Sequence, residues 1–247
     1  MDTSKQYALV CGARGGVGSA FVRAFSDAGF SVVCIVRPGS GKDAEVSFQD
    51  IKSPVHVYEA DCADADDVLK VVGRIIELHG NCSAAVFAAV EGLVRENIVS
   101  ISAADFHKAF SVSVFGAQAF FSALFPSMVQ GGHFIGITTS SLEPNVISGS
   151  LGGYIPAKYA LRGLLREFGE AGKKKGICVN AIAPGFMRTE LQKDMPERMD
   201  DFLKEKNPFH DIMTPERVAA FGVALASGVY GPVTGQTFVL GLGDVET

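Results

Sequence analysis

The sequence predicts an α/β fold, a single doubly wound parallel sheet with helices on both faces. Short apolar runs of strand length alternate along the chain with longer helical stretches. Strands that are buried on both faces have this continuous apolar character, and the alternation is typical of parallel sheets. With 247 residues, 47% of them hydrophobic, the chain is long enough for one large core. We therefore expect one domain over residues 1–247.

Composition argues against several classes of partner. The net charge of −5 disfavours nucleic acid, because phosphate contacts need a basic face. The longest apolar runs, such as Ala84–Val90, are far shorter than the ~20 residues that span a bilayer, and the polar N-terminus shows no signal peptide. Five scattered cysteines predict reduced thiols and no disulfide or metal framework. We expect a cytoplasmic protein with no metal, nucleic-acid or membrane partner. The cysteines are Cys11, Cys34, Cys62, Cys82 and Cys178.

The first expected strand is Tyr7–Cys11, and a glycine-rich loop follows it directly. A helix is expected over Ser19–Ala28, ended by Gly29, and a second strand over Ser31–Val36. This order is the context of a dinucleotide-binding turn, in which glycines let the backbone approach a pyrophosphate at the helix N-terminus. The alternative is a purely structural turn. The residues expected at the cofactor here are Gly12, Gly15, Gly16, Val17 and Gly18.

The end of the second strand bears on the choice of cofactor. An acidic residue there would bind the ribose 2′-hydroxyl of NAD, whereas an arginine accommodates the 2′-phosphate of NADP. The position is Arg37, no acid follows until Asp43, and Arg14 in the glycine loop adds a second positive charge. Arg37 could also be an ordinary solvated surface charge. The sequence favours NADP.

The third and fourth strands are expected over Val55–Ala60 and Ala84–Ala89. Ligands of open α/β sheets sit at the carboxyl ends of strands, which places Asp61 and Cys62 near the adenine ring. A capping role is the alternative for Asp61, because Asp64 and Asp66 start a helix that runs through Leu78.

The remaining elements follow the same alternation. A long Phe-rich helix is expected over Ala103–Val129, and its wide apolar surface needs cover from the sheet and from a second subunit. Gly131-Gly132 opens the fifth strand, His133–Thr138. Strands over Ile177–Ile182 and Val233–Leu240 complete the sheet.

The pair Tyr154-x-x-x-Lys158 carries the candidate chemistry. Residues four apart on a helix lie on the same face, and Pro156 suits the first turn of that helix. A free tyrosine has a pKa of about 10, and a neighbouring ammonium group favours the phenolate. We therefore expect Lys158 to lower the pKa of Tyr154 toward the range in which proton transfer is efficient. Such pairs also occur by chance, so the surrounding motifs decide their meaning.

Together these motifs resemble those of the short-chain dehydrogenase/reductase family over nearly the whole chain. The resemblance implies a Rossmann-like fold and hydride transfer between a carbonyl or alcohol substrate and a nicotinamide cofactor, here NADP. It also places the cofactor against Ala88, Tyr154, Lys158, Pro184, Gly185 and Thr189. The motifs that carry it are Gly12-x-x-x-Gly16-x-Gly18, Asp61, Tyr154-x-x-x-Lys158, Val179–Gly185 with Thr189, and Val233–Thr237.

The resemblance also implies catalytic roles for particular residues. In that family the tyrosine is the general acid, the lysine binds the nicotinamide ribose and lowers the tyrosine pKa, and a serine holds the substrate oxygen. Carried over, the catalytic residues are Ser141, Tyr154 and Lys158. Ser141 stands at the family's usual separation of thirteen residues from the tyrosine. Counting along the strand from the glycines points instead to Thr139, and Ser140 lies between the two.

Three positions depart from the family pattern. Cys11 replaces the usual threonine, Phe87-Ala88-Ala89-Val90 replaces Asn-Asn-Ala-Gly, and Ser113 replaces the asparagine that holds a water in the family's proton relay. These changes leave a second hypothesis open, a non-catalytic NADP(H)-binding sensor or scaffold on the same fold. The intact pair of Tyr154 and Lys158 argues for the enzyme.

The segment at about 186–214 is expected to cover the pocket as a lid. Its apolar residues favour a hydrophobic substrate but also suit plain packing, and its charges are mixed. The resemblance further implies a homodimer or homotetramer, assembled through the Phe-rich helix and the helix over Tyr154–Ala171.

Overall fold

Seven parallel strands form one sheet in the part of the chain that the computed structural model describes, which is residues 7–143, 149–193, 196, 198–206 and 209–241. The strand order is β3-β2-β1-β4-β5-β6-β7. Each strand overlaps one that the sequence predicts, so the predicted fold class is confirmed. The strands are β1(Tyr7–Cys11), β2(Ser31–Val36), β3(Val55–Glu59), β4(Cys82–Phe87), β5(Met128–Ile137), β6(Cys178–Pro184) and β7(Thr237–Leu240).

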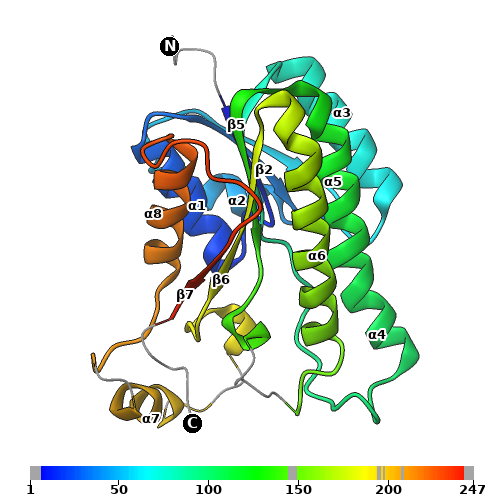
Figure 1. Ribbon diagram of the computed structural model, residues 1–247, viewed down its shortest axis with the longest axis vertical. Coiled ribbons are helices and arrows are strands. Elements are labelled where there is room, and N and C mark those ends of the chain that lie inside the picture. Colours follow the sequence, from blue (N-terminus) through cyan, green and yellow to red (C-terminus); the bar gives the residue numbers. More distant parts are fainter. Residues whose placement is uncertain (1–6, 144–148, 194–195, 197, 207–208, 242–247) are drawn as a thin grey trace.

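Helices cover both faces of the sheet (Figure 1). On one face α1(Gly16–Asp27) packs against α8(Pro215–Ala226). On the other face α5(Ala117–Leu124) packs between α3(Ala65–His79) and α6(Tyr154–Gly172). Three further α-helices of the described residues lie outside these layers or extend them. They are α2(Gly41–Ser47), α4(Ala103–Phe110) and α7(Arg198–Lys206).

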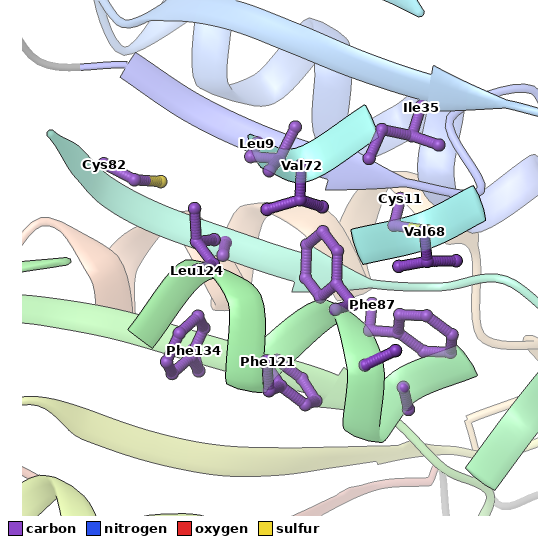
Figure 2. Close-up of a cluster of buried hydrophobic side chains, with 14 of the residues drawn as sticks. Leu9, Cys11, Ile35, Val68, Val72, Cys82, Phe87, Phe121, Leu124 and Phe134 are labelled. Atoms are coloured by element: carbon purple, nitrogen blue, oxygen red, sulfur yellow. The ribbon is translucent and has the colours of Figure 1, made fainter. Parts of the chain in front are cut away.

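The sheet separates two hydrophobic cores, because successive side chains of a strand point to opposite faces. In β1, Leu9 and Cys11 join the core beneath α3 and α5, whereas Ala8 and Val10 join the core beneath α1 and α8. Figure 2 shows the first of these cores. Burying each large side chain there contributes about 1.5–3 kcal/mol relative to leaving it exposed. Its labelled members are Leu9, Cys11, Ile35, Val68, Val72, Cys82, Phe87, Phe121, Leu124 and Phe134.

The long helix expected over residues 103–129 is interrupted. After α4 the chain forms a π-helical turn, η2(Ser111–Gly116), then α5 and a short 3₁₀ turn, η3(Phe125–Ser127). A π turn inserts an extra residue into a helix and is common at functional sites. By length and composition alone residues 103–127 could cross a membrane, but half of the most apolar window is buried inside this fold.

The start of β5 also differs from the prediction. Met128 pairs with Cys82 and His133 pairs with Ala84, so the strand begins before the glycines and its register shifts between these pairs. Gly131 has a φ of +80°, a value that favours glycine, and its N–H donates to the carbonyl of Gly176 at 2.8 Å. The two glycines therefore lie inside an irregular strand and do not open it.

Candidate active site

A cleft of about 820 Å³ lies at the carboxyl ends of the strands, where open α/β sheets bind ligands. The N-terminus of α1, the ends of β4, β5 and β6, and the start of α6 contribute to its walls. Most of the site residues predicted from the sequence meet there. They are Gly15, Gly16, Val17, Gly18, Arg37, Ala88, Ser141, Tyr154, Lys158, Pro184, Gly185 and Thr189.

The glycine loop tolerates no larger residue at two positions. Gly12 has a φ of +82°, and a Cβ there would lie 2.6 Å from the backbone nitrogen of Ala89. A Cβ on Gly18 would lie 2.1 Å from the carbonyl oxygen of Gly12. Gly15 begins α1 without a side-chain cap, and the first N–H groups of a helix have no intrahelical acceptor. Bare N–H groups at a helix N-terminus beside a cleft fit a dinucleotide pyrophosphate.

Lys158 is buried beneath Tyr154 in the first turns of α6. Its side chain is 3% exposed, and Nζ donates to the carbonyl oxygen of Ile137 at 2.8 Å. The same Nζ lies 5.6 Å from the ring centroid of Tyr154. Burial disfavours the ammonium form and lowers the pKa of Lys158 to about 8. This lysine is therefore close to the point at which it changes charge.

The pKa of Tyr154 moves in the direction opposite to the one predicted from its spacing to Lys158. Burial raises the pKa of Tyr154 to about 12, and a hydrogen bond with Thr139 offsets only part of that rise. The prediction of a lowered pKa is wrong here, because it considered the neighbouring charge and not the loss of hydration around the phenol. Tyr154 consequently holds its proton throughout the neutral range.

Thr139 is the hydroxyl residue in contact with Tyr154. It is the second residue after β5, and its Oγ1 donates to Oγ of Ser141 at 3.3 Å. Ser140 and Ser141 lie in the short turn η4(Ser140–Leu142), whose Leu142 carbonyl accepts a hydrogen bond from the Tyr159 hydroxyl at 2.8 Å. Thr139, Ser140 and Ser141 all line the cleft. The geometry thus favours Thr139 as the residue beside the candidate acid, with Ser141 one hydrogen bond away.

Comparison with known sequences identifies the family of the chain. A family model described as enoyl-(acyl carrier protein) reductase matches residues 12–243. The chain belongs to the short-chain dehydrogenase/reductase family. Dehydrogenase/reductase SDR family member 4 of Rattus norvegicus is 26% identical over 243 residues, which cover 97% of this chain and 87% of the relative. The 3-oxoacyl-[acyl-carrier-protein] reductase FabG of Thermotoga maritima is 25% identical and covers 92% of this chain and 93% of its own.

Solved structures share the fold of this short-chain dehydrogenase/reductase. One from Brucella melitensis is 21% identical, covers 98% of both chains and gives a TM-score of 0.89. A blue fluorescent protein from a metagenomic library, solved in complex with NADPH, is 23% identical and gives a TM-score of 0.87 over 98% of both chains. At these identities the likeness concerns the fold.

The two arginines of the expected cofactor site have different surroundings in this family member. Arg14 lies outside the cleft lining, and its Nη1 donates to Oδ2 of Asp43 at 3.1 Å. Arg37 lines the cleft, and within the described residues it takes part in no ion pair. Glu59 accepts N–H groups of Gly39 at 3.0 Å and Gly41 at 2.6 Å, which shapes the loop after Arg37 and lowers the pKa of that carboxyl group.

Asp61 and Cys62 lie at the same edge of the sheet but not in the cleft lining. Asp61 forms a local turn, because its Oδ1 accepts the N–H of Ala63 at 2.9 Å. Asp64 caps α3 by accepting the N–H groups of the second and third helical residues. The cap of α3 is therefore Asp64 and not Asp61, and adenine contact by Asp61 stays a prediction.

The loop that follows β4 lines the cleft although its residues after Ala88 were not predicted as site residues. Arg95 in this loop reaches across to the segment after β6, and its Nη2 donates to Oε1 of Gln192 at 3.3 Å. Position at a strand's carboxyl end was the signal that could have found the loop. The cleft residues that were not predicted include Val90, Glu91, Gly92, Leu93, Arg95 and Leu151.

The structure describes only part of the expected lid. Phe186, Met187 and Leu191 line the cleft, and η6(Glu190–Gln192) and α7 follow. Residues 194–195, 197 and 207–208 lie outside the described residues.

Ser113 lies in η2, which packs against α6, and is 2% exposed. It is not part of the cleft lining.

Proposed function

We propose that this protein is an NADP(H)-dependent oxidoreductase that interconverts a small-molecule carbonyl and an alcohol by hydride transfer. The observation that carries the proposal is that Tyr154, Lys158 and Thr139 line the same cleft as the glycine loop at the start of α1. NADPH, when bound, would supply the hydride. The fit of the glycine loop to a pyrophosphate supports a dinucleotide as the cofactor, and the family membership supports an oxidoreductase.

Tyr154 acts in this proposal as the general acid. Because its pKa is about 12, it carries a proton at neutral pH that it can donate to the substrate oxygen as negative charge develops there. Removing a proton from an alcohol would need the phenolate, which is scarce at neutral pH. The protonation state therefore favours reduction of a carbonyl, and the rate of alcohol oxidation should rise with pH.

Thr139 is proposed to polarise the substrate oxygen. It is the hydroxyl in contact with Tyr154, and Ser141 is the next hydroxyl in the same hydrogen-bonded chain. The thirteen-residue spacing to Tyr154 favours Ser141 for this role, whereas counting along the strand from Gly132 and the contact with Tyr154 favour Thr139. A preorganised donor gains strength as charge develops on the oxygen in the transition state.

NADP is proposed over NAD because of Arg37. This side chain lines the cleft at the end of β2, where it could bind a 2′-phosphate. The carboxylate at the end of the neighbouring β3, Glu59, already accepts two backbone N–H groups. One solved structure of the same fold was determined with NADPH.

The substrate is proposed to be a carbonyl compound with an apolar part, since several apolar side chains line the cleft. Two similar proteins bear the names 3-oxoacyl-[acyl-carrier-protein] reductase and acetoacetyl-CoA reductase. Acyl thioesters with a 3-oxo group are therefore the first class to test. The apolar residues are Leu93, Leu151, Phe186, Met187 and Leu191.

The decisive experiment measures NADPH and NADH consumption on 3-oxoacyl thioesters, simple ketones, aldehydes and quinones, with Tyr154→Phe in parallel. We expect turnover with NADPH that disappears in the phenylalanine variant, while NADPH affinity changes little. Saturable NADPH binding without turnover on any substrate would favour the sensor or scaffold hypothesis. Retained turnover in the variant would contradict the role of Tyr154.

A further inference from the structure

Two of the five cysteines are in contact beside the expected cofactor site. Sγ of Cys11 lies 3.4 Å from Sγ of Cys62, although the residues are 51 positions apart in the chain. Cys11 is the last residue of β1, and Cys62 lies in the loop between β3 and α3. The other three cysteines lie in β2, β4 and β6 and have no sulfur contact in the described part of the chain.

The two thiols differ in access to solvent. Cys11 is fully buried in the core that Figure 2 shows, whereas Cys62 is partly exposed at the margin of that core. The hydrogen bond to Cys62 and burial both raise the pKa of the Cys11 thiol well above its usual range. A dissolved oxidant therefore reaches Cys62 first. Cys11, in contact with Cys62, is then the second thiol, which forms the disulfide.

We propose that Cys11 and Cys62 form a redox-active dithiol, which closes to a disulfide on exposure to hydrogen peroxide and thereby weakens binding of the dinucleotide. In the first step the Cys62 thiolate attacks one peroxide oxygen, the O–O bond breaks, and the leaving hydroxide takes a proton to become water. In the second step the Cys11 sulfur attacks the Cys62 sulfenic acid, the S–O bond breaks, and a second water leaves with the Cys11 proton. Two thiols are oxidised by two electrons and one peroxide is reduced to two waters.

Closing the bond requires movement of the loop that carries Cys62. A disulfide is about 2.05 Å long, so the sulfur atoms must approach by about 1.4 Å. Cys11 is held in the centre of the sheet, where β1 pairs with β2 and β4. Cys62 is in a loop that packs closely on η2, since a Cβ on Gly116 would lie 2.1 Å from the carbonyl oxygen of Cys62. We therefore expect Cys62 and its loop, and not β1, to move when the bond closes.

The disulfide is expected to weaken cofactor binding because each cysteine is next in the chain to a residue of the expected cofactor site. Cys11 directly precedes Gly12, and Cys62 directly follows Asp61, which is expected beside the adenine. This half of the inference rests on the proposed dinucleotide function. Loss of one adenine hydrogen bond would weaken NADPH binding roughly tenfold.

The test uses the full chain, reduced with dithiothreitol, freed of reductant and treated with hydrogen peroxide. Mass spectrometry after blocking of free thiols should show loss of two hydrogen atoms and a linked pair of peptides containing Cys11 and Cys62. The dissociation constant of NADPH, measured by fluorescence, should rise roughly tenfold and return after dithiothreitol. The variant Cys178→Ala, which removes a thiol without a sulfur neighbour, should keep the link. Cys62→Ala should lose it, and its NADPH affinity should not respond to peroxide.

Absence of the linked peptides in the peroxide-treated chain would overturn the dithiol. Linked peptides with unchanged NADPH affinity would overturn the effect on the cofactor. If the reduced chain binds no dinucleotide at all, the proposed function and the cofactor effect both fail, while the linked peptides still support the dithiol. The mass measurement therefore separates the two proposals.

Discussion

At the scale of single residues, burial of the charged Lys158 side chain in the candidate site lowers the free energy of unfolding. Its folded pKa of about 8 lies below the ordinary value of 10.5, so burying this ammonium costs about 3 kcal/mol at neutral pH. Replacing it removes that cost but leaves the Ile137 carbonyl without its donor, a loss of about 1–3 kcal/mol. We expect Lys158→Met to be inactive and yet at least as stable as the wild type at pH 7 in urea unfolding.

The pH dependence of that difference has a defined sign. Between pH 8 and 10.5 the unfolded chain keeps the Lys158 proton and the folded chain has lost it, so wild-type stability gains from this residue as pH rises. The stability advantage of Lys158→Met should therefore shrink across this window. An advantage that stays constant from pH 7 to 10.5 would contradict the lowered pKa.

The reduction rate of the wild type should fall as pH rises through about 8, where Lys158 loses its charge.

The two hydroxyl residues can be separated by substitution. Thr139→Val keeps the shape of the side chain and removes the group in contact with Tyr154, so we expect kcat to fall by roughly 10²–10³. Ser141→Ala removes the outer hydroxyl and should lower kcat less than about tenfold, a change near that of one ordinary hydrogen bond. Steady-state kinetics of both variants measure the two losses of kcat. A larger loss in Ser141→Ala than in Thr139→Val would show that Ser141 polarises the substrate oxygen.

Arg37 should set the preference between the two nicotinamide cofactors. In Arg37→Asp a carboxylate would repel the 2′-phosphate and could accept a hydrogen bond from a ribose 2′-hydroxyl, so NADPH affinity should fall at least about tenfold and NADH affinity should rise. Calorimetric titration with both cofactors gives the ratio. Arg23→Gln is a matched control, because Arg23 is an exposed arginine of α1 that pairs with Asp50 at 2.8 Å. Equal losses in both variants would indicate a general charge effect.

At the scale of elements, the glycine turn should tolerate substitution far less than a helix interior. In Gly18→Ala the new Cβ would meet the Gly12 carbonyl at 2.1 Å, so we expect a loss of about 1–3 kcal/mol in stability and the loss of cofactor binding. A Cβ added to Gly73 in α3 would meet no atom within 4 Å. Gly73→Ala should stabilise the protein by about 0.5–1 kcal/mol. Thermal unfolding of both variants tests the contrast, and similar effects would contradict it.

Elements with both faces buried were predictable from the sequence, and irregular ones were not. The strand Tyr7–Cys11 is apolar at every position because β1 lies between two cores, and the structure returns the same bounds. The π turn at Ser111–Gly116 has no periodic signature, and its Gly116 lies against the distant loop that carries Cys62, a contact that sequence spacing does not give. The extension of β5 to Met128 likewise depends on pairing with Cys82.

The same division applies to the candidate site. The glycines and the pair Tyr154 and Lys158 were identifiable because the turn and the helix fix their spacing in the chain. The contact of Thr139 with Tyr154 and the raised pKa of that tyrosine depend on packing between separate elements. Sequence spacing gives the distance along a helix but not the loss of hydration, and here hydration decides the direction of the pKa shift.

At the scale of the whole molecule, two of the exposed apolar side chains lie on the helices through which we expect subunits to associate. Phe115 in η2 is 51% exposed and Tyr159 in α6 is 47% exposed, and the two elements pack against each other. Large apolar side chains grouped on helices commonly mark interfaces between subunits. We therefore expect the homodimer or homotetramer that the family resemblance implies, assembled through this helical face.

Phe115→Glu tests the assembly, because it places a charge at the centre of the expected interface without entering the core. The variant should have a smaller mass than the wild type in light scattering at equal concentration, with an unchanged circular dichroism spectrum. Val46→Glu is the control, since Val46 is 63% exposed on α2, which packs against β3 at the edge of the sheet. It should leave the mass unchanged. A wild type that is monomeric at micromolar concentration would contradict the expected interface. Equal loss of assembly in both variants would mean that the contact lies elsewhere on the surface.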